Sequence, residues 1–387
     1  MTTHVPLLII GAGPYGLAMA AYAGHRRLDY VICGHPMDFW KSNMPRGMLL
    51  RSSWDWHIDP LGVHTLQAYA NAHNVNTGGA DPIPRDLFLR YAAWFQQEKA
   101  VQALPTLVHR LEHVHDGFAA TLDNQETITA RHVLVAPGFR YFQQIPAELA
   151  NMLPPHRFSH SCDLVRFEPL AGKRCLIIGG RQSAFEWAAL LREHGAAAVH
   201  VCHRHDTPKF DASDWSWVRA LVEATGTNPT WYRTLSAGQR EEITRRFWAE
   251  GRLKLEPWLA PRISHDAIAV WPRSRMIACT ELPGGDFEVT LDVGQRLRVD
   301  YVILATGYSV DVRQIPYLAR GNVLSTLHMN NGYPRLDESF QSNIPGLYFT
   351  SLPATQDFGP FFGFVIGAPV AARVIGASIE QQLARSR

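Results

Sequence analysis

The chain has 387 residues, which is more than one small domain needs and about what two domains need. Hydrophobic residues make up 46% and charged residues 19%, so the chain can bury a sizeable core and is not disordered as a whole. Lys and Arg (37) nearly balance Asp and Glu (35), which excludes the basic field that nucleic acid or an anionic membrane surface would require. We therefore expect neither among its partners.

Cysteine usage indicates a reducing compartment. The five cysteines are odd in number and widely spaced, and no Cys-x-x-Cys occurs, so a disulfide framework is not expected. Residues 5–24 carry no charge and are apolar enough for a membrane span, but they contain several glycines, and no Lys or Arg precedes them. A nucleotide-binding turn explains those glycines better than an export signal, and we expect a soluble, cytoplasmic protein.

The first predicted elements are a strand, a tight turn and a helix. Residues 7–10 form a continuous apolar run, as a buried parallel strand does, and residues 17–23 favour a helix. A second apolar run at 30–33 completes a βαβ unit. Between the first strand and the helix, residues 11–16 read Gly-Ala-Gly-Pro-Tyr-Gly, which is the pattern of a dinucleotide-binding turn.

Each glycine of this turn has a physical purpose if it binds a dinucleotide. Gly11 makes the tight turn, Gly13 allows a pyrophosphate to approach the backbone, and Gly16 lets the helix pack on the strand. An acidic residue is expected at the end of the second strand to hold the ribose, but Gly34 and His35 stand there, and Asp38 is the nearest carboxylate. The alternative is a purely structural glycine-rich turn.

The middle of the chain repeats this pattern. Residues 175–178 are apolar, residues 179–184 read Gly-Gly-Arg-Gln-Ser-Ala, and a helix at 185–194 leads to a strand at 199–202. Arg181 takes the place of the second glycine, so its side chain could itself reach a phosphate. Arg204 follows the next strand, where a cation accepts an adenosine 2′-phosphate, which favours NADPH over NADH. The alternative is that Arg204 is a solvated loop residue.

Each glycine turn is followed, after nearly the same number of residues, by a strand that ends in Ala-x-Gly. These ends lie at 136–138 and 305–307. The internal duplication implies two nucleotide sites.

Between the second glycine turn and the second Ala-x-Gly end, the stretch from about 206 to 258 holds five of the chain's 11 tryptophans and includes a predicted helix at 237–248. It predicts either a lid over an apolar pocket or a filled core. Hairpin-like strands are then predicted at 268–271, 276–281, 287–291 and 297–299.

Two such turns, together with Ala-Thr-Gly-Tyr at 305–308, resemble the class B flavin monooxygenases, which include flavin-containing monooxygenases, Baeyer–Villiger monooxygenases and ornithine or lysine N-hydroxylases. The resemblance covers nearly the whole chain, with further family-like segments at 34–40, 48–52, 84–95 and 346–360. It implies an α/β fold of two Rossmann-like dinucleotide-binding domains with the NADPH domain inserted into the FAD domain. The expected boundaries are 1–165 and 301–387 for FAD, and 166–300 for NADPH with the tryptophan-rich insertion.

The turns and the resemblance together give the expected site residues. For FAD they are Gly11, Gly13, Pro14, Tyr15, Gly16, Asp38, Trp40, Arg51, Ser52, Gly138, Gly307, Phe358 and Gly359. For NADPH they are Gly179, Arg181, Gln182, Ser183, Arg204 and Thr306. Near the reaction we expect Arg51 at the flavin or its peroxide, His57 as a proton donor or acceptor, and His160 at NADP⁺.

The C-terminal residues offer a second anion site. Gly359 to Gly363 precede an apolar helix that runs to about Gln382, so their N–H groups could stabilise the flavin pyrimidine when reduction makes it anionic. A plain buried helix is the alternative. No metal site is expected, although His109, His113 and His115 lie close together on a strand-like segment.

The reaction is narrowed by what the chain lacks. Without Cys-x-x-Cys it does not resemble a disulfide reductase, and without a membrane-binding helix it does not resemble a quinone reductase, so O₂ is the expected acceptor. Reduced flavin and O₂ would form a C4a-(hydro)peroxide, which needs a dry pocket to avoid release of H₂O₂. The Baeyer–Villiger fingerprint is missing, since residues 158–163 resemble only its histidine portion.

The expected function is NADPH- and O₂-dependent oxygenation of a small apolar or heterocyclic metabolite, in natural-product metabolism, with Baeyer–Villiger-type insertion favoured. N-hydroxylation of an amine is one alternative. An NADPH oxidase or reductase without oxygen transfer is another, and a nucleotide-binding sensor is a third. A homodimer is left open.

Overall fold

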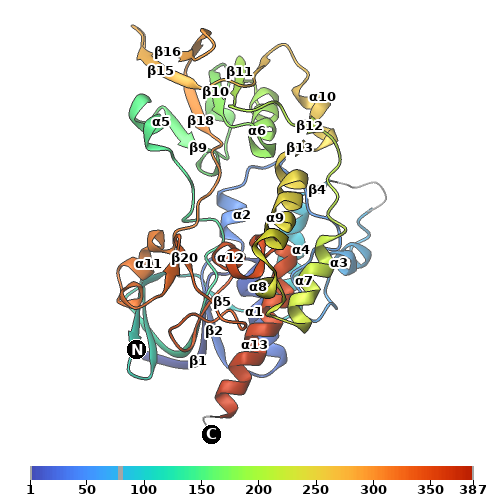
Figure 1. Ribbon diagram of the computed structural model, residues 1–387, viewed down its shortest axis with the longest axis vertical. Coiled ribbons are helices and arrows are strands. Elements are labelled where there is room, and N and C mark those ends of the chain that lie inside the picture. Colours follow the sequence, from blue (N-terminus) through green and yellow to red (C-terminus); the bar gives the residue numbers. More distant parts are fainter. Residues whose placement is uncertain (1, 77–81, 386–387) are drawn as a thin grey trace.

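The computed structural model describes residues 2–76 and 82–385, and two sheets organise them (Figure 1). The larger sheet has the order β5-β2-β1-β8-β7-β6, with β21 also paired to β8. The strands β5, β2, β1, β8 and β21 are parallel, whereas β7 and β6 form an antiparallel extension of β8. The bounds are β1 (Thr2–Ile10), β2 (Tyr30–Cys33), β5 (Ala103–Leu104), β6 (Val108–Val114), β7 (Gly117–Leu122), β8 (Thr127–Val135) and β21 (Leu347–Phe349).

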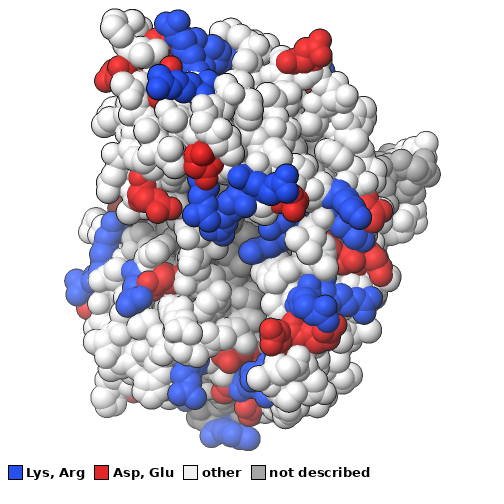
Figure 2. Space-filling view, turned by 45° about the horizontal axis from the view of Figure 1, so that its top comes forward, with Lys and Arg blue, Asp and Glu red and all other residues white. Residues whose placement is uncertain are grey.

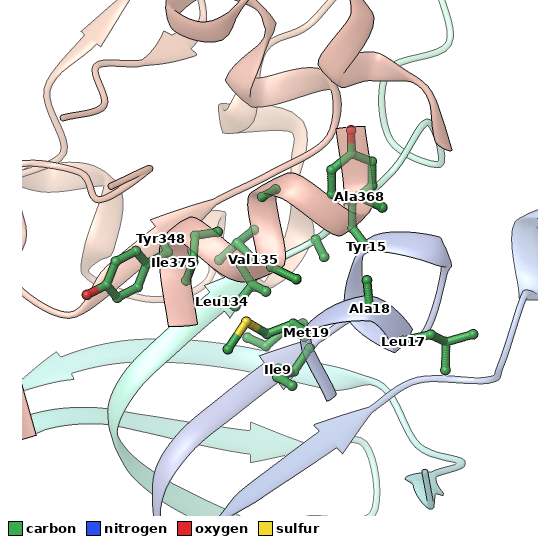
Figure 3. Packing of buried hydrophobic residues seen from close by; sticks show 14 of the residues in the cluster. Ile9, Tyr15, Leu17, Ala18, Met19, Leu134, Val135, Tyr348, Ala368 and Ile375 are labelled. Carbon is green, nitrogen blue, oxygen red and sulfur yellow. The ribbon is translucent and has the colours of Figure 1, made fainter. Parts of the chain in front are cut away.

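Strand β1 lies inside the sheet, between β2 and β8, and its side chains are covered on both faces. Leu7, Leu8 and Ile9 are fully buried, as the continuous apolar run predicted. Helix α1 (Pro14–His25), with proline in its first turn, packs beside the long helix α13 (Ala368–Ala384). Figure 3 shows Met19 of α1 and Ile375 of α13 in one buried cluster with side chains of β1 and β8.

The second sheet is entirely parallel and has the order β14-β11-β10-β18-β9. It lies at the top of Figure 1, with α6 (Gln182–Glu193) beside it. The two Rossmann-like units expected from the sequence are therefore present. The bounds are β9 (Phe158–His160), β10 (Arg174–Ile178), β11 (Ala198–Cys202), β14 (Ile268–Trp271) and β18 (Tyr301–Leu304).

Two expectations need correction in this sheet. The strand at 268–271, expected to be hairpin-like, pairs in parallel with β11, because it follows a crossover rather than a tight turn. Strands β9 and β18 lie outside the expected 166–300 domain yet pair with each other and belong to this sheet. The remaining three expected strands do form an antiparallel meander, β15 (Met276–Glu281), β16 (Phe287–Leu291) and β17 (Arg296–Val299).

The tryptophan-rich insertion folds into helices that lie on the right of Figure 1, below the second sheet and beside α13. Helix α9 (Ala237–Arg252) begins at Ser236, whose hydroxyl accepts a hydrogen bond from the backbone N of Gln239 in a capping box. The predicted helix is confirmed and extends one turn beyond Trp248. Helix α7 (Val218–Thr227) packs against α13 of the first unit.

Short elements connect these parts, together with several 3₁₀ turns. Among the described residues, no helix is both long and apolar enough to cross a membrane. The other helices are α2 (Asp38–Ser42), α3 (Leu66–Ala72), α4 (Arg85–Glu98), α5 (Ala147–Met152), α8 (Trp231–Thr234), α10 (Ala260–Ile263), α11 (Pro316–Ala319) and α12 (Thr355–Phe358). The other strands are β3 (Leu49–Leu50), β4 (Ile83–Pro84), β12 (Lys209–Phe210), β13 (Lys254–Leu255), β19 (Met329–Asn330) and β20 (Tyr333–Pro334).

Candidate functional site

A cleft opens at the carboxyl ends of β1, β2 and β8. This is the edge at which parallel α/β sheets bind nucleotides. It brings together many of the expected FAD residues, namely Gly11, Gly13, Pro14, Tyr15, Asp38, Trp40, Ser52 and Gly138. It also has lining residues that the sequence did not single out, including Phe139, Arg140, Tyr141, Tyr317, Ser351, Phe364 and Val365.

The first glycine turn fits a dinucleotide. A Cβ on Gly11 would lie 2.3 Å from the carbonyl oxygen of Ala136, and one on Gly16 would lie 1.8 Å from the carbonyl oxygen of Gly11. No atom lies within 4 Å of where a Cβ on Gly13 would be, so the open side of the turn faces the cleft. Two glycines are required by the fold and the third leaves space for a phosphate, as the spacing predicted.

The carboxylate of Asp38 lies at this cleft, near the end of β2. It forms an ion pair with Arg140 and accepts a hydrogen bond from the Ser42 hydroxyl at 3.0 Å. Asp38 thus occupies the region where a ribose-binding acid is expected, and Arg140 is a second polar group there that the sequence did not indicate.

The C-terminal part of the cleft differs from the expectation. Phe358 is fully buried and stacks on Phe340 with ring centroids 3.5 Å apart. Gly363, Phe364 and Val365 line the cleft in its place, just before α13. Two short 3₁₀ turns, Pro360–Gly363 and Val365–Gly367, separate Gly359 from α13. The sequence pattern predicted a single helix start here and did not show which residues before α13 face the cleft.

The first turn and this C-terminal segment are joined directly. The Tyr15 hydroxyl donates to the backbone oxygen of Phe364 at 2.9 Å and contacts the backbone oxygen of Phe362. Burial raises the pKa of Tyr15 well above its usual value, so the hydroxyl stays a donor. Tyr15 therefore fixes two sides of the cleft relative to each other.

The second glycine turn repeats the steric pattern of the first. A Cβ on Gly179 would lie 2.4 Å from the carbonyl oxygen of Ala305. Gly180 takes the place of Ala12, and a Cβ there would lie 2.4 Å from the His203 ring. Arg181 takes the place of Gly13, so a cationic side chain stands where the first turn leaves its backbone open.

The expected NADPH residues surround this turn. Arg181 is the N-cap of α6, Ser183 is exposed in its first turn, and Arg204 is exposed on the loop after β11. The side-chain oxygen of Gln182 accepts a hydrogen bond from the backbone N of Glu256 in the insertion, at 3.1 Å. Burial lowers the pKa of Arg181, as do the nearby cations Arg252 and Arg204. The turn therefore carries a cluster of positive charge.

Thr306 and Gly307 lie where the chain passes between the two sheets. The Thr306 hydroxyl donates to the backbone oxygen of Gln144, and the backbone N of Gln144 donates to the oxygen of Gly307 at 2.9 Å. His160 is fully buried at the same junction, where its Nε2 donates to the Gly307 oxygen at 3.1 Å. Its Nδ1 accepts from the backbone N of Cys162 at 3.3 Å.

His160 therefore uses both ring nitrogens within the protein. Burial also lowers its pKa and raises the pKa of the adjacent Cys162 thiol to about 12. The expected contact of His160 with NADP⁺ has no free ring nitrogen to support it in this arrangement. The residue joins the two connecting segments instead.

Arg51 points away from the expected flavin contact. Its guanidinium donates to Glu256 Oε1 at 2.8 Å, to the backbone oxygen of Gly251 at 2.7 Å and to that of Glu250 at 3.0 Å. The last two are carbonyls from the final turn of α9, where a cation is favourable. Arg51 thus ties the segment after β3 to the insertion, and its neighbour Ser52 is the one that lines the cleft.

His57 lies in a second pocket between the 55–62 loop, α7 and the start of α13. Its Nδ1 is buried, with no hydrogen-bond partner among the described residues. Burial, with the nearby Arg219, lowers its pKa, so the ring is neutral at pH 7. Two ion pairs border the pocket, Arg219 with Asp55 at 2.6 Å and Arg373 with Glu223 at 2.7 Å.

Four aromatic side chains close the space between the cleft and the insertion. Ring centroids are 6.1 Å apart for Trp56 and Trp215, 5.4 Å for Trp215 and Phe247, 5.3 Å for Phe247 and Phe364, and 6.4 Å for Phe364 and Trp56. We call this ring of contacts the aromatic wall. Because Phe364 also lines the cleft, the wall places insertion residues directly behind it.

A buried carboxyl group, which the sequence did not reveal, lies under the second turn. Glu186 of α6 is fully buried, and its Oε1 accepts a hydrogen bond from the backbone N of Leu49 at 2.8 Å. Its Oε2 has no hydrogen-bond partner among the described residues. Burial raises the pKa of Glu186 to about 8. Helix α6 is therefore fastened to the first unit by a group that is largely protonated at neutral pH.

Comparisons with known proteins agree with this architecture. Residues 8–228 match the family model for pyridine nucleotide-disulphide oxidoreductases. An FAD-dependent urate hydroxylase from Xanthomonas campestris is 25% identical over 335 residues, which are 81% of this chain and 67% of that protein. A ferredoxin–NADP reductase from Nocardioides is 27% identical over 207 residues, and the chain spans only about half of its length, 55%.

Solved structures share the fold over almost the whole chain. An ornithine N-hydroxylase of Kutzneria, with reduced FAD, NADP⁺ and L-ornithine, has a TM-score of 0.82 at 14% identity and covers 98% of this chain and 99% of its own. Ornithine hydroxylase from Pseudomonas aeruginosa has a TM-score of 0.80 at 19% identity, covering 98% and 100%. A flavin-containing monooxygenase from Stenotrophomonas maltophilia has a TM-score of 0.67 at 19% identity and covers 100% of both chains. The expected resemblance is confirmed, and so is the α/β fold.

Substitutions at two glycines of the first turn should affect different properties, folding stability at Gly16 and cofactor binding at Gly13. We expect Gly16→Ala to lower the free energy of unfolding by about 1–3 kcal/mol, because its Cβ would collide with the Gly11 carbonyl. Gly13→Asp has room for its side chain and should fold normally, but its carboxylate would occupy and repel the phosphate site, giving colourless protein. Thermal unfolding and flavin absorbance measure the two effects. A yellow Gly13→Asp protein would contradict the cradle assignment.

Glu186 predicts a pH-dependent stability. Its folded-state pKa of about 8 lies above that of an unfolded glutamate, so the folded state binds more protons, and stability is lost as pH rises toward 8. Glu186→Gln keeps the acceptor for Leu49 and should gain thermal stability over the wild type between pH 5 and pH 8, on the order of 5 °C. Glu193→Gln, on the same helix but ion-paired to Arg262, should show no such trend. A constant difference for Glu186→Gln across this range would contradict the assignment.

Proposed function

The chain belongs to the pyridine nucleotide-disulphide oxidoreductase family, and we propose that it is an NADPH- and O₂-dependent flavin monooxygenase of a small, flat, apolar or heterocyclic metabolite. FAD binds in the first cleft, and NADPH binds at the second turn. One observation carries this proposal: the cleft that contains the open glycine turn is bordered by the aromatic wall. This arrangement leaves little polar surface beside the place where substrate would bind.

The residues that hold the cofactors follow from the two turns. Gly13, Pro14 and Asp38 would hold FAD, with the backbone of Gly363 and Phe364 beside its reactive end. Arg181 and Arg204 would hold the phosphates of NADPH. When bound, the two coenzymes supply hydride transfer and the activation of O₂ for transfer of one oxygen atom.

The protein's own contribution is enclosure. The aromatic wall has no charged member, and Trp56 and Phe247 are almost completely buried, so water reaches this side of the cleft poorly. Trp215 is partly buried, and Phe364, which lines the cleft, is the most exposed member at 38%. Flat apolar molecules stack favourably on such rings, which supports a heterocyclic substrate or a ring ketone rather than a free amino acid. Oxygen insertion beside a carbonyl remains our prediction for this class.

N-hydroxylation of an amine is the second candidate, and one observation favours it. The pocket that contains His57 is bordered by two carboxylates and two guanidinium groups, which could bind both ends of an amino acid. The Kutzneria and Pseudomonas proteins of similar fold act on ornithine. In this chain, however, those four charges already pair with one another.

The proposal predicts tight coupling with the right substrate class. Purified FAD-loaded protein is given NADPH and ¹⁸O₂ with ring ketones and purine-like heterocycles in one set, and ornithine and lysine in another. We expect one ¹⁸O atom in a heterocycle or ketone product and less than one H₂O₂ per NADPH. Labelled hydroxylamine would select the second candidate. Stoichiometric H₂O₂ with every compound would show an oxidase, and no NADPH consumption would show a non-catalytic sensor.

Phe364 should control this coupling. Phe364→Ala opens the exposed side of the aromatic wall, so we expect the share of NADPH that appears as H₂O₂ to rise severalfold with the best substrate. Phe210 is equally exposed, at 38%, but lies on β12 away from the cleft, so Phe210→Ala should leave that share unchanged. An unchanged share in Phe364→Ala would argue against the wall as a water barrier.

A further inference from the structure

Three arginines from separate segments converge at the second glycine turn. Arg181 caps α6, Arg204 follows β11, and Arg252 is the last residue of α9 in the insertion. An Arg181 Nη donates to the backbone oxygen of Arg252, which fixes the end of α9 against the turn. Sequence patterning indicated Arg181 and Arg204 but not Arg252, because the contact joins residues that are far apart in the chain.

None of these three arginines forms an ion pair with a carboxylate of the described residues, whereas several arginines nearby do. Arg51 pairs with Glu256, Arg246 with Asp214 and Arg262 with Glu193. Among the ion pairs of the described residues, none involves Arg181, Arg204 or Arg252. Asp206 and Glu250, the carboxylates nearest in the sequence to Arg204 and Arg252, contact Arg273 and Lys254 instead.

The cluster is also held in place rather than spread into solvent. The guanidinium carbon of Arg252 lies 3.5 Å from the ring centroid of Trp248, one turn earlier in α9. Burial lowers the pKa of Arg252, and Arg252 and Arg204 both lower the pKa of Arg181. Three like charges brought together without a counterion repel one another, so the arrangement is suited to an anion. Figure 2 shows Lys and Arg side chains gathered along the edge of a hollow on one face of the molecule.

We propose that Arg252, supplied by the tryptophan-rich insertion, completes the phosphate site for the nicotinamide coenzyme with Arg181 and Arg204. The inference rests on the proposed NADPH dependence and adds a coenzyme-binding role for the insertion. The guanidinium packs on the Trp248 ring in an exposed side chain, so its N–H groups stay accessible to a phosphate oxygen.

The placement has a consequence for the cleft. Phe247, which belongs to the aromatic wall, and Arg252 lie on the same rigid helix. A coenzyme phosphate that neutralises the three arginines would hold the end of α9 in place and, with it, the wall behind Phe364. Coenzyme binding and enclosure of the substrate side are then linked through one helix.

The test is coenzyme binding to the FAD-loaded protein, measured by isothermal titration with NADP⁺ and with NAD⁺. We expect Arg252→Gln to weaken NADP⁺ binding by roughly tenfold or more, as loss of a charge-assisted hydrogen bond does, while Arg252→Lys loses less. A loss confined to NADP⁺ would place Arg252 at the 2′-phosphate. An equal loss for both coenzymes would place it at the pyrophosphate. Either result supports the proposal.

Arg246→Gln is the matched control. Arg246 lies on the same helix and also packs on a tryptophan, with its guanidinium carbon 4.4 Å from the Trp217 ring centroid, but it pairs with Asp214. It should bind both coenzymes like the wild type. Wild-type affinity in Arg252→Gln, with unchanged flavin absorbance and thermal unfolding, overturns the proposal while leaving the proposed function intact. Failure of the wild type to bind NADP⁺ overturns both.

Discussion

One steric constraint, used twice, underlies the whole arrangement. In each unit a glycine after the first strand lies so close to the alanine at the end of the closing strand that a Cβ would sit 2.3 Å or 2.4 Å from its carbonyl oxygen, for Gly11 with Ala136 and Gly179 with Ala305. Both glycines have positive φ, 111° and 151°, which side chains rarely adopt. The contact forces the turn to the carboxyl edge of the sheet, where a phosphate can meet a helix N-terminus.

Because this constraint is local, it could be predicted from the sequence. The glycine spacing, the apolar strand before each turn and the Ala-x-Gly strand ends specify the two units without any long-range information. The exact side-chain contacts could not be predicted. Arg51 and His160 follow motifs that suggest cofactor contacts, but Arg51 meets carbonyls of α9 about two hundred residues away and His160 meets Gly307. Such partners depend on how the two units pack, which no local pattern encodes.

The joint between the units is polar, which is unusual for a buried interface. Arg51, Ser213 and Glu256 form one hydrogen-bonded group, while Gln182 and Glu186 connect α6 to the insertion and to the first unit. Removing one member of such a group would leave a largely buried charge or donor without its partner. The network therefore ties the insertion to both units through directional contacts.

The tryptophans of the insertion take part both in the packed core and in the aromatic wall beside the cleft. Trp215 is partly buried against the main core and is also a member of the aromatic wall, and Trp248 supports Arg252 on the other side of the same helix region. A helix that bears one face of the wall at Phe247 and a cation at its end cannot move at one place without moving at the other. The aromatic residues thus tie the position of the wall to the position of the arginines at the second glycine turn.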